Sequence, residues 1–276
     1  MDEFQEHTEP PNPDDPVPRP PIISPADDTD ANPVFNPAWR LSTGRAVLEL
    51  LIVITALLIP LIIRRFVFGL EPVTIGQRLG KNVYWAVVVN GTPVTLVVFL
   101  LLWIDGHPWR SVGLYLKKMT NTIIAAGAAL FVIYVLQFLL VLLLAIFWPE
   151  MWKKFYQDRR ELTQMFPRIS LPGLVLFTLF VGFYEELLFR GFLITRLRFV
   201  VKNVWVALIA AGVLFGVIHD YQDPFAQIQI VVVAVVLGAL FIIRQNLIAP
   251  ILVHAAFDFI SLFMSIYGQE YLSELK

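Results

Sequence analysis

The sequence predicts an all-α fold: a polytopic transmembrane helix bundle with about seven or eight spans around a membrane-embedded polar cavity. Hydrophobic residues make up 57% of the 276 residues and charged residues 16%. Soluble domains are usually about 45–50% apolar and about 25% charged. The mean hydropathy is +0.69, and seven apolar runs are long enough to cross a hydrocarbon core of about 30 Å.

The first forty residues predict a disordered, acidic, proline-rich tail. A segment of this composition cannot bury enough apolar surface to offset its chain entropy. It also lacks the apolar stretch of a cleavable signal peptide. We therefore divide the chain into a tail at 1–40 and an integral membrane helical domain at 41–276.

The spans are predicted from the apolar runs that follow this tail. Before the fourth span, residues 149–170 interleave aromatic and charged side chains, which is typical of an amphipathic helix at the membrane interface. Ser170 supplies an N-cap and Pro172 an early proline for the fourth span. The predicted spans are 46–63, 83–104, 120–148, 171–195, 204–220, 225–243 and 247–267.

Composition also excludes several function classes. The chain has no cysteine, which rules out disulfides, thiolate nucleophiles and cysteine metal sites. The net charge is −1, without a basic stripe or a Gly-rich phosphate loop, so no nucleic-acid partner is expected. The expected partner common to all readings is the lipid bilayer, crossed several times.

Few ionisable side chains fall within the predicted spans, where a charge costs at least about 2.5–3.5 kcal/mol. Glu49 lies one turn into the first span and is expected to be solvated near the interface. The others are candidates for function by default, because charges at this depth are kept only for a reason. They are Glu185, Glu186, Arg190, His219, His254 and Asp258.

In the fourth span, Glu186 and Arg190 have the i,i+4 spacing of a helical ion pair. Such a pair offsets much of the cost of both charges, and a role as glue between helices would explain it. Glu185 lies about 100° round the helix, which leaves it without an intrahelical partner. The glue interpretation does not account for Glu185.

Two histidines complete the set. His254 and Asp258 share a face of the seventh span at i,i+4, and small alanines beside them permit close helix approach. His219 lies one turn beyond Phe215 in the fifth span, where Gly212 and Gly216 predict tight packing on another helix. A lone histidine in an apolar helix is more often a core residue, but two at membrane depth near the glutamates favour function.

Depth predicts how far the fourth helix runs. If it continues through 192–199, Glu185 lies about 20 Å from the interface, His219 about 24 Å and His254 about 14 Å. The depths of the three residues in the membrane then differ by no more than one long side chain can span. We therefore predict the long helix.

The motifs E-E-x-x-x-R (Glu185, Glu186, Arg190), F-x-x-x-H (His219) and H-x-x-x-D (His254, Asp258), in this order on successive apolar helices, resemble the CPBP (Abi) intramembrane protease family. That family includes type II CAAX prenyl endopeptidases and bacteriocin-processing or immunity proteins. The resemblance covers roughly 171–267, the motif core of what would be a helical protease domain.

The resemblance implies an intramembrane endopeptidase, a CAAX-protease-like hydrolase. Glu185 would be the general base that activates water, and His219 would hold and polarise that water. His254 and Asp258 would stabilise the oxyanion, with Glu186 and Arg190 as supporting residues. A carboxylate in low-dielectric surroundings is a stronger base, and donors in a dry site act more strongly than in water.

The cofactor remains open between two alternatives. No cofactor is required in the favoured mechanism; in a metalloprotease mechanism Glu185, His219, His254 and Asp258 would ligate a divalent metal such as zinc, although the chain has no HExxH motif. Asp258 stands where many eukaryotic CAAX endopeptidases carry asparagine. It would therefore orient His254, stay protonated or bind metal.

The substrate implied by the resemblance is a peptide or protein, lipid-modified or membrane-associated, and the expected location is a bacterial plasma membrane. Two other functions stay open. Buried Glu, His and Asp side chains could form the relay of a proton-coupled transporter. The same fold could also serve a bacteriocin-immunity protein without turnover.

Overall fold

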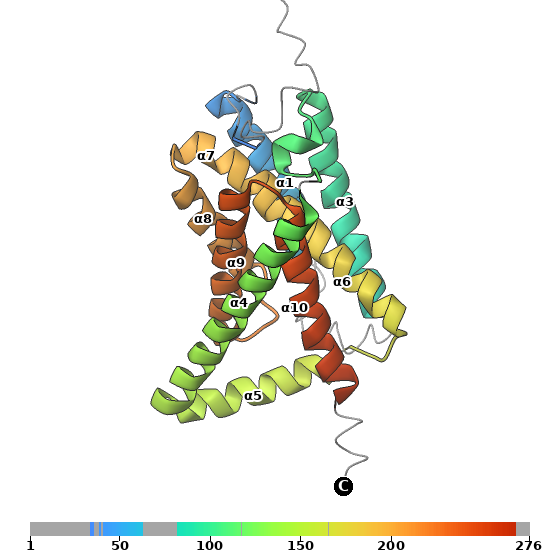
Figure 1. The fold of residues 1–276 in the computed structure, drawn as a ribbon, viewed down its shortest axis with the longest axis vertical. Helices are drawn as coiled ribbons and strands as arrows, with labels where there is room; N and C mark the ends of the chain where they lie inside the picture. The colour runs from blue at the N-terminus through green and yellow to red at the C-terminus, as the bar shows by residue number, and fades with distance from the viewer. Residues whose placement is uncertain are drawn as a thin grey trace, which may run out of the picture. The chain divides into compact units, whose positions relative to one another are not determined.

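The computed structural model describes residues 34–35, 39, 41–62, 82–116, 118–164 and 166–268. The predicted tail at 1–40 lies almost entirely outside these residues, so its disorder stays a prediction. Every regular element within the described ranges is helical, as Figure 1 shows. The elements are α1 (Thr43–Ile62), α3 (Val83–Ile104), η4 (Trp109–Val112), α4 (Met119–Phe147), α5 (Pro149–Gln164), α6 (Leu171–Glu186), η5 (Leu187–Ile194), α7 (Thr195–Val201), α8 (Val204–Val217), α9 (Pro224–Arg244) and α10 (Ile248–Ile266).

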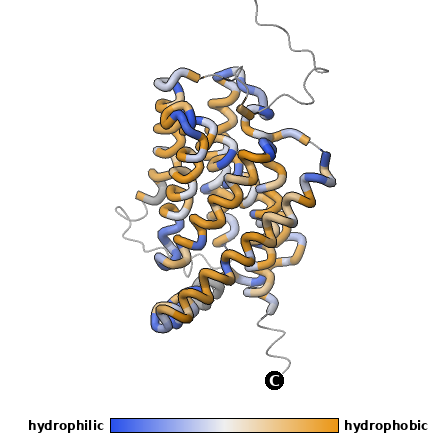
Figure 2. The backbone as a smooth tube through the Cα atoms, turned by 60° about the vertical axis from the view of Figure 1, so that its left-hand side comes forward, coloured by the Kyte–Doolittle hydropathy of each residue, from blue (hydrophilic) through white to orange (hydrophobic). Residues whose placement is uncertain are grey.

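The predicted all-α, polytopic class is confirmed. Among the described residues, five helices are long and apolar enough to cross a membrane, namely α3, α4, α9, α10 and the continuous helix Leu171–Val201. Apolar residues run along most of the length of these helices (Figure 2). Many large apolar side chains on α4 face outward, for example Phe131 and Phe138, which suits a helix surface in contact with lipid tails.

Most predicted boundaries fall within one turn of the observed helix ends, and the fourth span runs on as predicted. It forms one helix from Leu171 to Val201. Its N-terminus is capped by Ser170, whose hydroxyl accepts a hydrogen bond from the Gly173 amide. At its far end the chain turns at Lys202 in the left-handed conformation before Asn203 caps α8.

The fifth predicted span is shorter than expected. Helix α8 ends at Val217, and it is a short apolar helix, about 21 Å long at 1.5 Å per residue. The chain then makes a turn, and Asp223 caps α9 through its carboxylate while Pro224 occupies the first turn. The prediction that the helix continues to residue 220 is therefore wrong. The chain needs a turn before the Asp223 cap and Pro224 that start α9, so α8 ends earlier.

Helix packing brings the motif-bearing segments together. Helix α6 packs on α10, α8 on α9, and α4 on both α9 and α10. The predicted tight packing at Gly212 and Gly216 is confirmed against α9: a Cβ on Gly216 would meet Val231, and one on Gly212 would lie 3.5 Å from Val235 Cγ2. The amphipathic helix predicted within 149–170 forms as α5, which lies across the end of the bundle next to α4 and α10 (Figure 1). Its location at the membrane interface stays a prediction.

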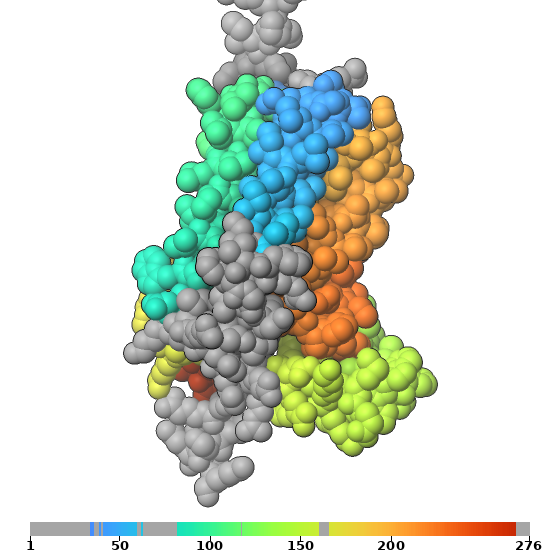
Figure 3. Space-filling view, turned by 180° about the vertical axis from the view of Figure 1, so that it is seen from behind, coloured from blue at the N-terminus to red at the C-terminus, as the bar shows by residue number. Residues whose placement is uncertain are grey.

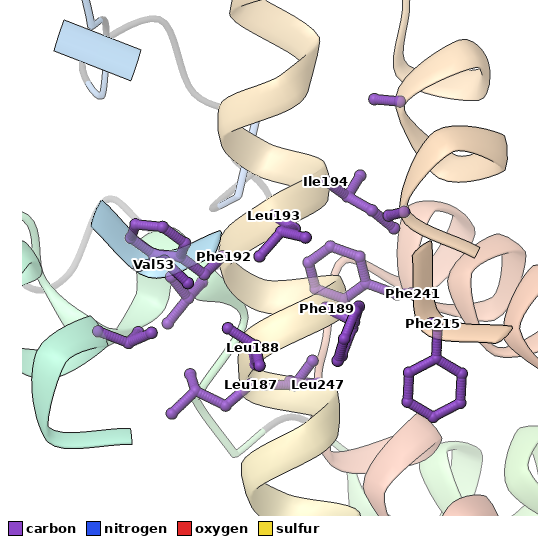
Figure 4. Packing of buried hydrophobic residues seen from close by; sticks show 14 of the residues in the cluster. Val53, Leu187, Leu188, Phe189, Phe192, Leu193, Ile194, Phe215, Phe241 and Leu247 are labelled. Carbon is purple, nitrogen blue, oxygen red and sulfur yellow. The ribbon is translucent and has the colours of Figure 1, made fainter. Parts of the chain in front are cut away.

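The middle of the long helix is π-helical. All eight residues from Leu187 to Ile194 are buried. Figure 4 shows the hydrophobic side chains of this segment packed with Phe215 of α8, Phe241 of α9 and Leu247. A π-helical turn widens the helix and is often found at functional sites. It begins directly after Glu186, and the sequence pattern did not predict it.

Glu49 is not solvated, contrary to the prediction. Its side chain is fully buried, and its two oxygens pair with Arg45 Nε at 2.9 Å and Arg196 Nε at 3.0 Å. Arg45 also binds Asp105 at 2.7 Å. Helix α1 lies between α3 and the α7–α8 region (Figure 3), so these charges meet between helices that are far apart in the sequence.

Candidate active site

Close packing of α6 on α10 sets the frame of the site. A Cβ on Gly182 would lie 3.0 Å from the Ala255 nitrogen and 3.1 Å from the Ile251 oxygen. Only glycine fits there without moving the two backbones apart. The approach predicted from the alanines after His254 is therefore confirmed at Ala255, and it brings one turn of α6 beside one turn of α10.

His254 lies at the centre of three carboxyl groups. Its Nε2 is 3.6 Å from Glu185 Oε2 and 3.4 Å from Asp258 Oδ2. Its Nδ1 is 2.7 Å from Glu186 Oε1. His254 and Glu186 are buried, with 7% and 0% of their surfaces exposed, and Glu185 is 9% exposed. The sequence prediction that His254 and Asp258 share a face is confirmed.

Glu186 has two partners. The predicted ion pair with Arg190 forms at 2.8 Å between Arg190 Nη1 and Glu186 Oε1. The same oxygen faces His254 Nδ1. A carboxylate can only accept, so His254 carries its hydrogen on Nδ1 and directs Nε2 towards Glu185 and Asp258. Glu186 is therefore the residue that fixes the orientation of the His254 ring. The sequence analysis had given Asp258 as a candidate for this role.

Arg190 is held on three sides although it is almost fully buried. Besides Glu186, its Nη2 donates to the Ala234 carbonyl of α9 at 3.3 Å, and its guanidinium lies 4.8 Å from the centre of the Phe215 ring. An ion pair, a hydrogen bond and a cation–π contact together offset the desolvation of the charge. Arg190 thus ties the π-helical segment to α8 and α9.

Glu185 is not without an intrahelical partner, which corrects the sequence prediction. The Tyr184 hydroxyl donates to Glu185 Oε1 at 2.7 Å. The other oxygen, Oε2, faces His254. Helical spacing rules do not pair neighbouring residues, so no sequence pattern could have found Tyr184.

His219 lies in the turn after α8 rather than in a span. Its Nδ1 is 2.6 Å from the Phe215 carbonyl oxygen, which can only accept, so Nδ1 carries the hydrogen. The His219 and His254 rings both neighbour the Phe215 ring, with centroid distances of 4.7 Å and 6.1 Å. Tyr221 also contacts the His219 ring, at 5.5 Å, and it was missed by the sequence interpretation.

The structure thus joins Glu185, Glu186, Arg190, His254 and Asp258 through direct contacts. His219 approaches this cluster through the Phe215 ring, which neighbours both histidines. Within the described residues, no group of three or more His, Asp or Glu side chains is arranged to hold a metal ion. We derive no step of the chemistry through a metal.

One comparison with known proteins gives a match to part of the chain. Residues 167–260 match the model of the family described as type II CAAX prenyl endopeptidase Rce1-like. Comparisons with curated proteins and with solved structures give no significant match. The matched segment contains the whole cluster round His254, and it supports an intramembrane protease that acts on a peptide or protein. Over residues 167–260 this chain is similar to the type II CAAX prenyl endopeptidase Rce1-like family.

Proposed function

We propose that this protein hydrolyses a peptide bond with a water molecule activated by Glu185, without an obligatory metal. The observation that carries the proposal is the arrangement round His254, whose Nε2 faces Glu185 Oε2 at 3.6 Å and Asp258 Oδ2 at 3.4 Å. A general base, a polarising imidazole and a second carboxyl group thus converge on one place.

The reaction follows from these positions. Glu185 Oε2 accepts a proton from water as the water oxygen attacks the scissile carbonyl carbon. The carbonyl oxygen becomes an oxyanion, and it accepts a hydrogen bond from Nε2–H of His254 in its doubly protonated form. The peptide C–N bond then breaks, and protonated Glu185 returns the proton to the leaving amine. Glu185 ends the cycle as it began. The products are a carboxylic acid and an amine, and transfer of the acid's proton to the amine gives a carboxylate and an ammonium group.

Glu186 and Arg190 act through His254 in this proposal. Glu186 accepts the Nδ1 hydrogen, which fixes the plane of the ring, and Arg190 keeps a positive charge beside Glu186. Asp258 faces the same nitrogen as the oxyanion would, so its carboxylate balances the charge of the protonated imidazole. Asp258 therefore supports His254 rather than donating to the oxyanion itself.

His219 holds the attacking water in this proposal. Its Nδ1 hydrogen is committed to the Phe215 carbonyl, so Nε2 of the neutral ring is free to accept a hydrogen bond from water. The Phe215 ring neighbours both histidines and Arg190, which limits the directions that either imidazole can take.

The family description suggests the substrate class. We propose a peptide with a prenylated or otherwise lipid-modified cysteine close to its C-terminus, whose lipid lies among the bilayer chains while the peptide reaches the cluster. Lipidation adds about 0.8 kcal/mol of membrane affinity per buried CH₂, which would concentrate such a peptide beside the spans. A bacterial plasma membrane remains the predicted location.

The test is cleavage of an internally quenched peptide with a farnesylated cysteine and three following residues. Purified wild-type protein in lipid nanodiscs is expected to cleave it, and Glu185→Ala and His219→Ala are expected to lose at least about a hundredfold in kcat. Cleavage by both variants at the wild-type rate would rule out the mechanism. Proton-gradient-dependent flux in liposomes, without any cleavage, would instead favour a transporter.

A further inference from the structure

We propose that Tyr184 is a positioning residue for Glu185, and that its hydroxyl gives the two oxygens of Glu185 separate tasks. The tyrosine ring is held in place against Gly91 of α3. This inference rests on the proposed function, since it concerns the same carboxylate. It also extends the working part of the molecule to α3, which lies outside the matched segment 167–260.

The hydrogen bond from Tyr184 occupies one oxygen of Glu185. The hydroxyl lies 2.7 Å from Oε1, a short distance that is typical of a donor bonded to a charged acceptor. The other oxygen faces His254 Nε2 at 3.6 Å, too far for a good direct hydrogen bond. With Oε1 occupied, Oε2 is the oxygen left to take a proton from water.

The tyrosine ring is itself fixed by a close contact on α3. A Cβ on Gly91 would lie 2.9 Å from Tyr184 Cδ1 and 3.0 Å from Cε1. Gly91 is buried, and it leaves room for the ring where any other residue would push it away. The Phe180 ring lies on the tyrosine as well, with a centroid distance of 5.3 Å. The hydroxyl therefore reaches Glu185 from a ring that has little freedom to move.

A purely structural role for this tyrosine is a weaker explanation. Tyr84, at the start of α3, shows such a role: its hydroxyl donates to the Pro167 carbonyl at 2.7 Å and its ring packs on Phe177. That contact ties a loop to a helix. The Tyr184 hydroxyl instead donates to the carboxylate of Glu185, whose other oxygen faces His254.

Other charged and titratable groups face Glu185 from the elements around it, and all of them stay in place when the Tyr184 hydroxyl is removed. His254 of α10 faces it directly, with Asp258 next to that histidine, and Arg190 of η5 and Tyr221 of the α8–α9 turn lie near enough to interact with its charge. The effect of Tyr184→Phe can therefore be assigned to one hydrogen bond.

The first test compares Tyr184→Phe with Tyr84→Phe on the farnesylated peptide at one fixed pH. Loss of a hydrogen bond to a charged group corresponds to about tenfold to hundredfold in rate. We expect Tyr184→Phe to lower kcat by this factor with KM unchanged, because the hydroxyl positions the base and does not bind the peptide. Tyr84→Phe should keep the wild-type kcat. A wild-type kcat in Tyr184→Phe, or equal losses in both variants, would overturn the inference.

The second test uses Gly91→Ala, alone and combined with Tyr184→Phe. The added methyl group displaces the ring, so Gly91→Ala is expected to lower kcat about as much as Tyr184→Phe does. In the Tyr184→Phe background no hydroxyl remains to be misplaced, and Gly91→Ala should then change kcat little further. Losses that simply multiply would show that Gly91 and Tyr184 act independently, against the inference.

A third measurement does not depend on turnover. The infrared carboxylate band of Glu185, assigned by its absence in Glu185→Gln, is expected to shift in Tyr184→Phe and to stay in place in Tyr84→Phe. An unchanged band in Tyr184→Phe would contradict the inference. If the band shifts but wild-type protein cleaves no peptide, the positioning of Glu185 by Tyr184 stands and the proposed hydrolysis fails.

Discussion

Nδ1 of His254 lies 2.7 Å from Oε1 of Glu186, so the second glutamate of the pair fixes which nitrogen of His254 faces the first. The two adjacent glutamates therefore have different tasks, although they are neighbours on one helix. Glu185 presents an oxygen to His254 Nε2, and Glu186 holds the ring from the opposite side. This division of tasks is the basis of the predictions that follow.

Breaking the Glu186–Arg190 pair should destabilise the fold strongly. Removal of one partner leaves a buried charge without compensation, at a cost of about 3–5 kcal/mol. We expect Glu186→Gln and Arg190→Met each to lower the unfolding temperature in detergent, and the double variant to lose less than the sum of the two. Additive losses would show that the 2.8 Å contact contributes little.

The Gly182 contact should be needed for activity as well as for packing. The Cβ of Gly182→Ala would meet the backbone of α10 at 3.0–3.1 Å, which pushes Glu185 away from His254. We expect at least a tenfold fall in kcat, since misplacement of about 1 Å can cost a hundredfold. Gly127→Ala on α4 is the control, because nothing lies within 4 Å of its added Cβ. Equal activity of the two variants would argue against this geometry.

Replacement of His219 by asparagine should separate its structural contact from its role in holding water. Asparagine can keep a donor near the position of Nδ1, which bonds the Phe215 carbonyl, but it has no group at the position of Nε2. His219→Asn is therefore expected to keep the thermal stability of the wild type but lose activity by about 10²–10⁴-fold. Wild-type activity in His219→Asn would exclude Nε2 as the group that holds water.

Stability should fall in mild acid because of His107, in the loop after α3. Burial, and then the nearby Arg196, lower the pKa of His107 below its ordinary value of 6.5. Below about pH 6.5, His107 therefore binds a proton more readily in the unfolded chain than in the folded protein. The contribution of neutral His107 to the free energy of unfolding is present above this pH and is lost as the pH falls. Thermal unfolding of wild type should show this decrease between pH 7 and pH 5, and His107→Asn should reduce it. Equal slopes for both proteins would contradict the assignment.

Removal of metal should leave the activity unchanged. Our mechanism uses only side chains and water, so protein shown by elemental analysis to be free of metal is expected to keep its full kcat. Loss of cleavage on chelation, restored by adding zinc, would support the metalloprotease alternative with Glu185, His219, His254 and Asp258 as ligands.

The features that follow from helical periodicity were predictable from the sequence. The Glu186–Arg190 pair and the shared face of His254 and Asp258 depend only on i,i+4 spacing, and both are observed. The length of the fourth helix also followed, because no stop signal interrupts it before Lys202. These features are local, so one segment is enough to specify them.

The features that depend on contacts between distant segments were not predictable. Glu49 looked like an interfacial residue, yet it pairs with Arg196, which lies 147 residues further along the chain. In the π-helical segment, Phe189 and Phe192 pack in a core that residues from several distant helices complete. The link between Glu186 and His254 likewise needs the close approach of α6 and α10 at Gly182, and a single sequence does not state which helices meet.

The most direct test of the central claim is a single-turnover cleavage of the farnesylated peptide in oxygen-18 water. We predict that wild-type protein places the label in the new carboxyl group of the product during the first turnover, and that Glu185→Gln gives no product above background. Product from Glu185→Gln at the wild-type rate, or a first turnover that leaves the label out of the product, would contradict attack by water activated at Glu185.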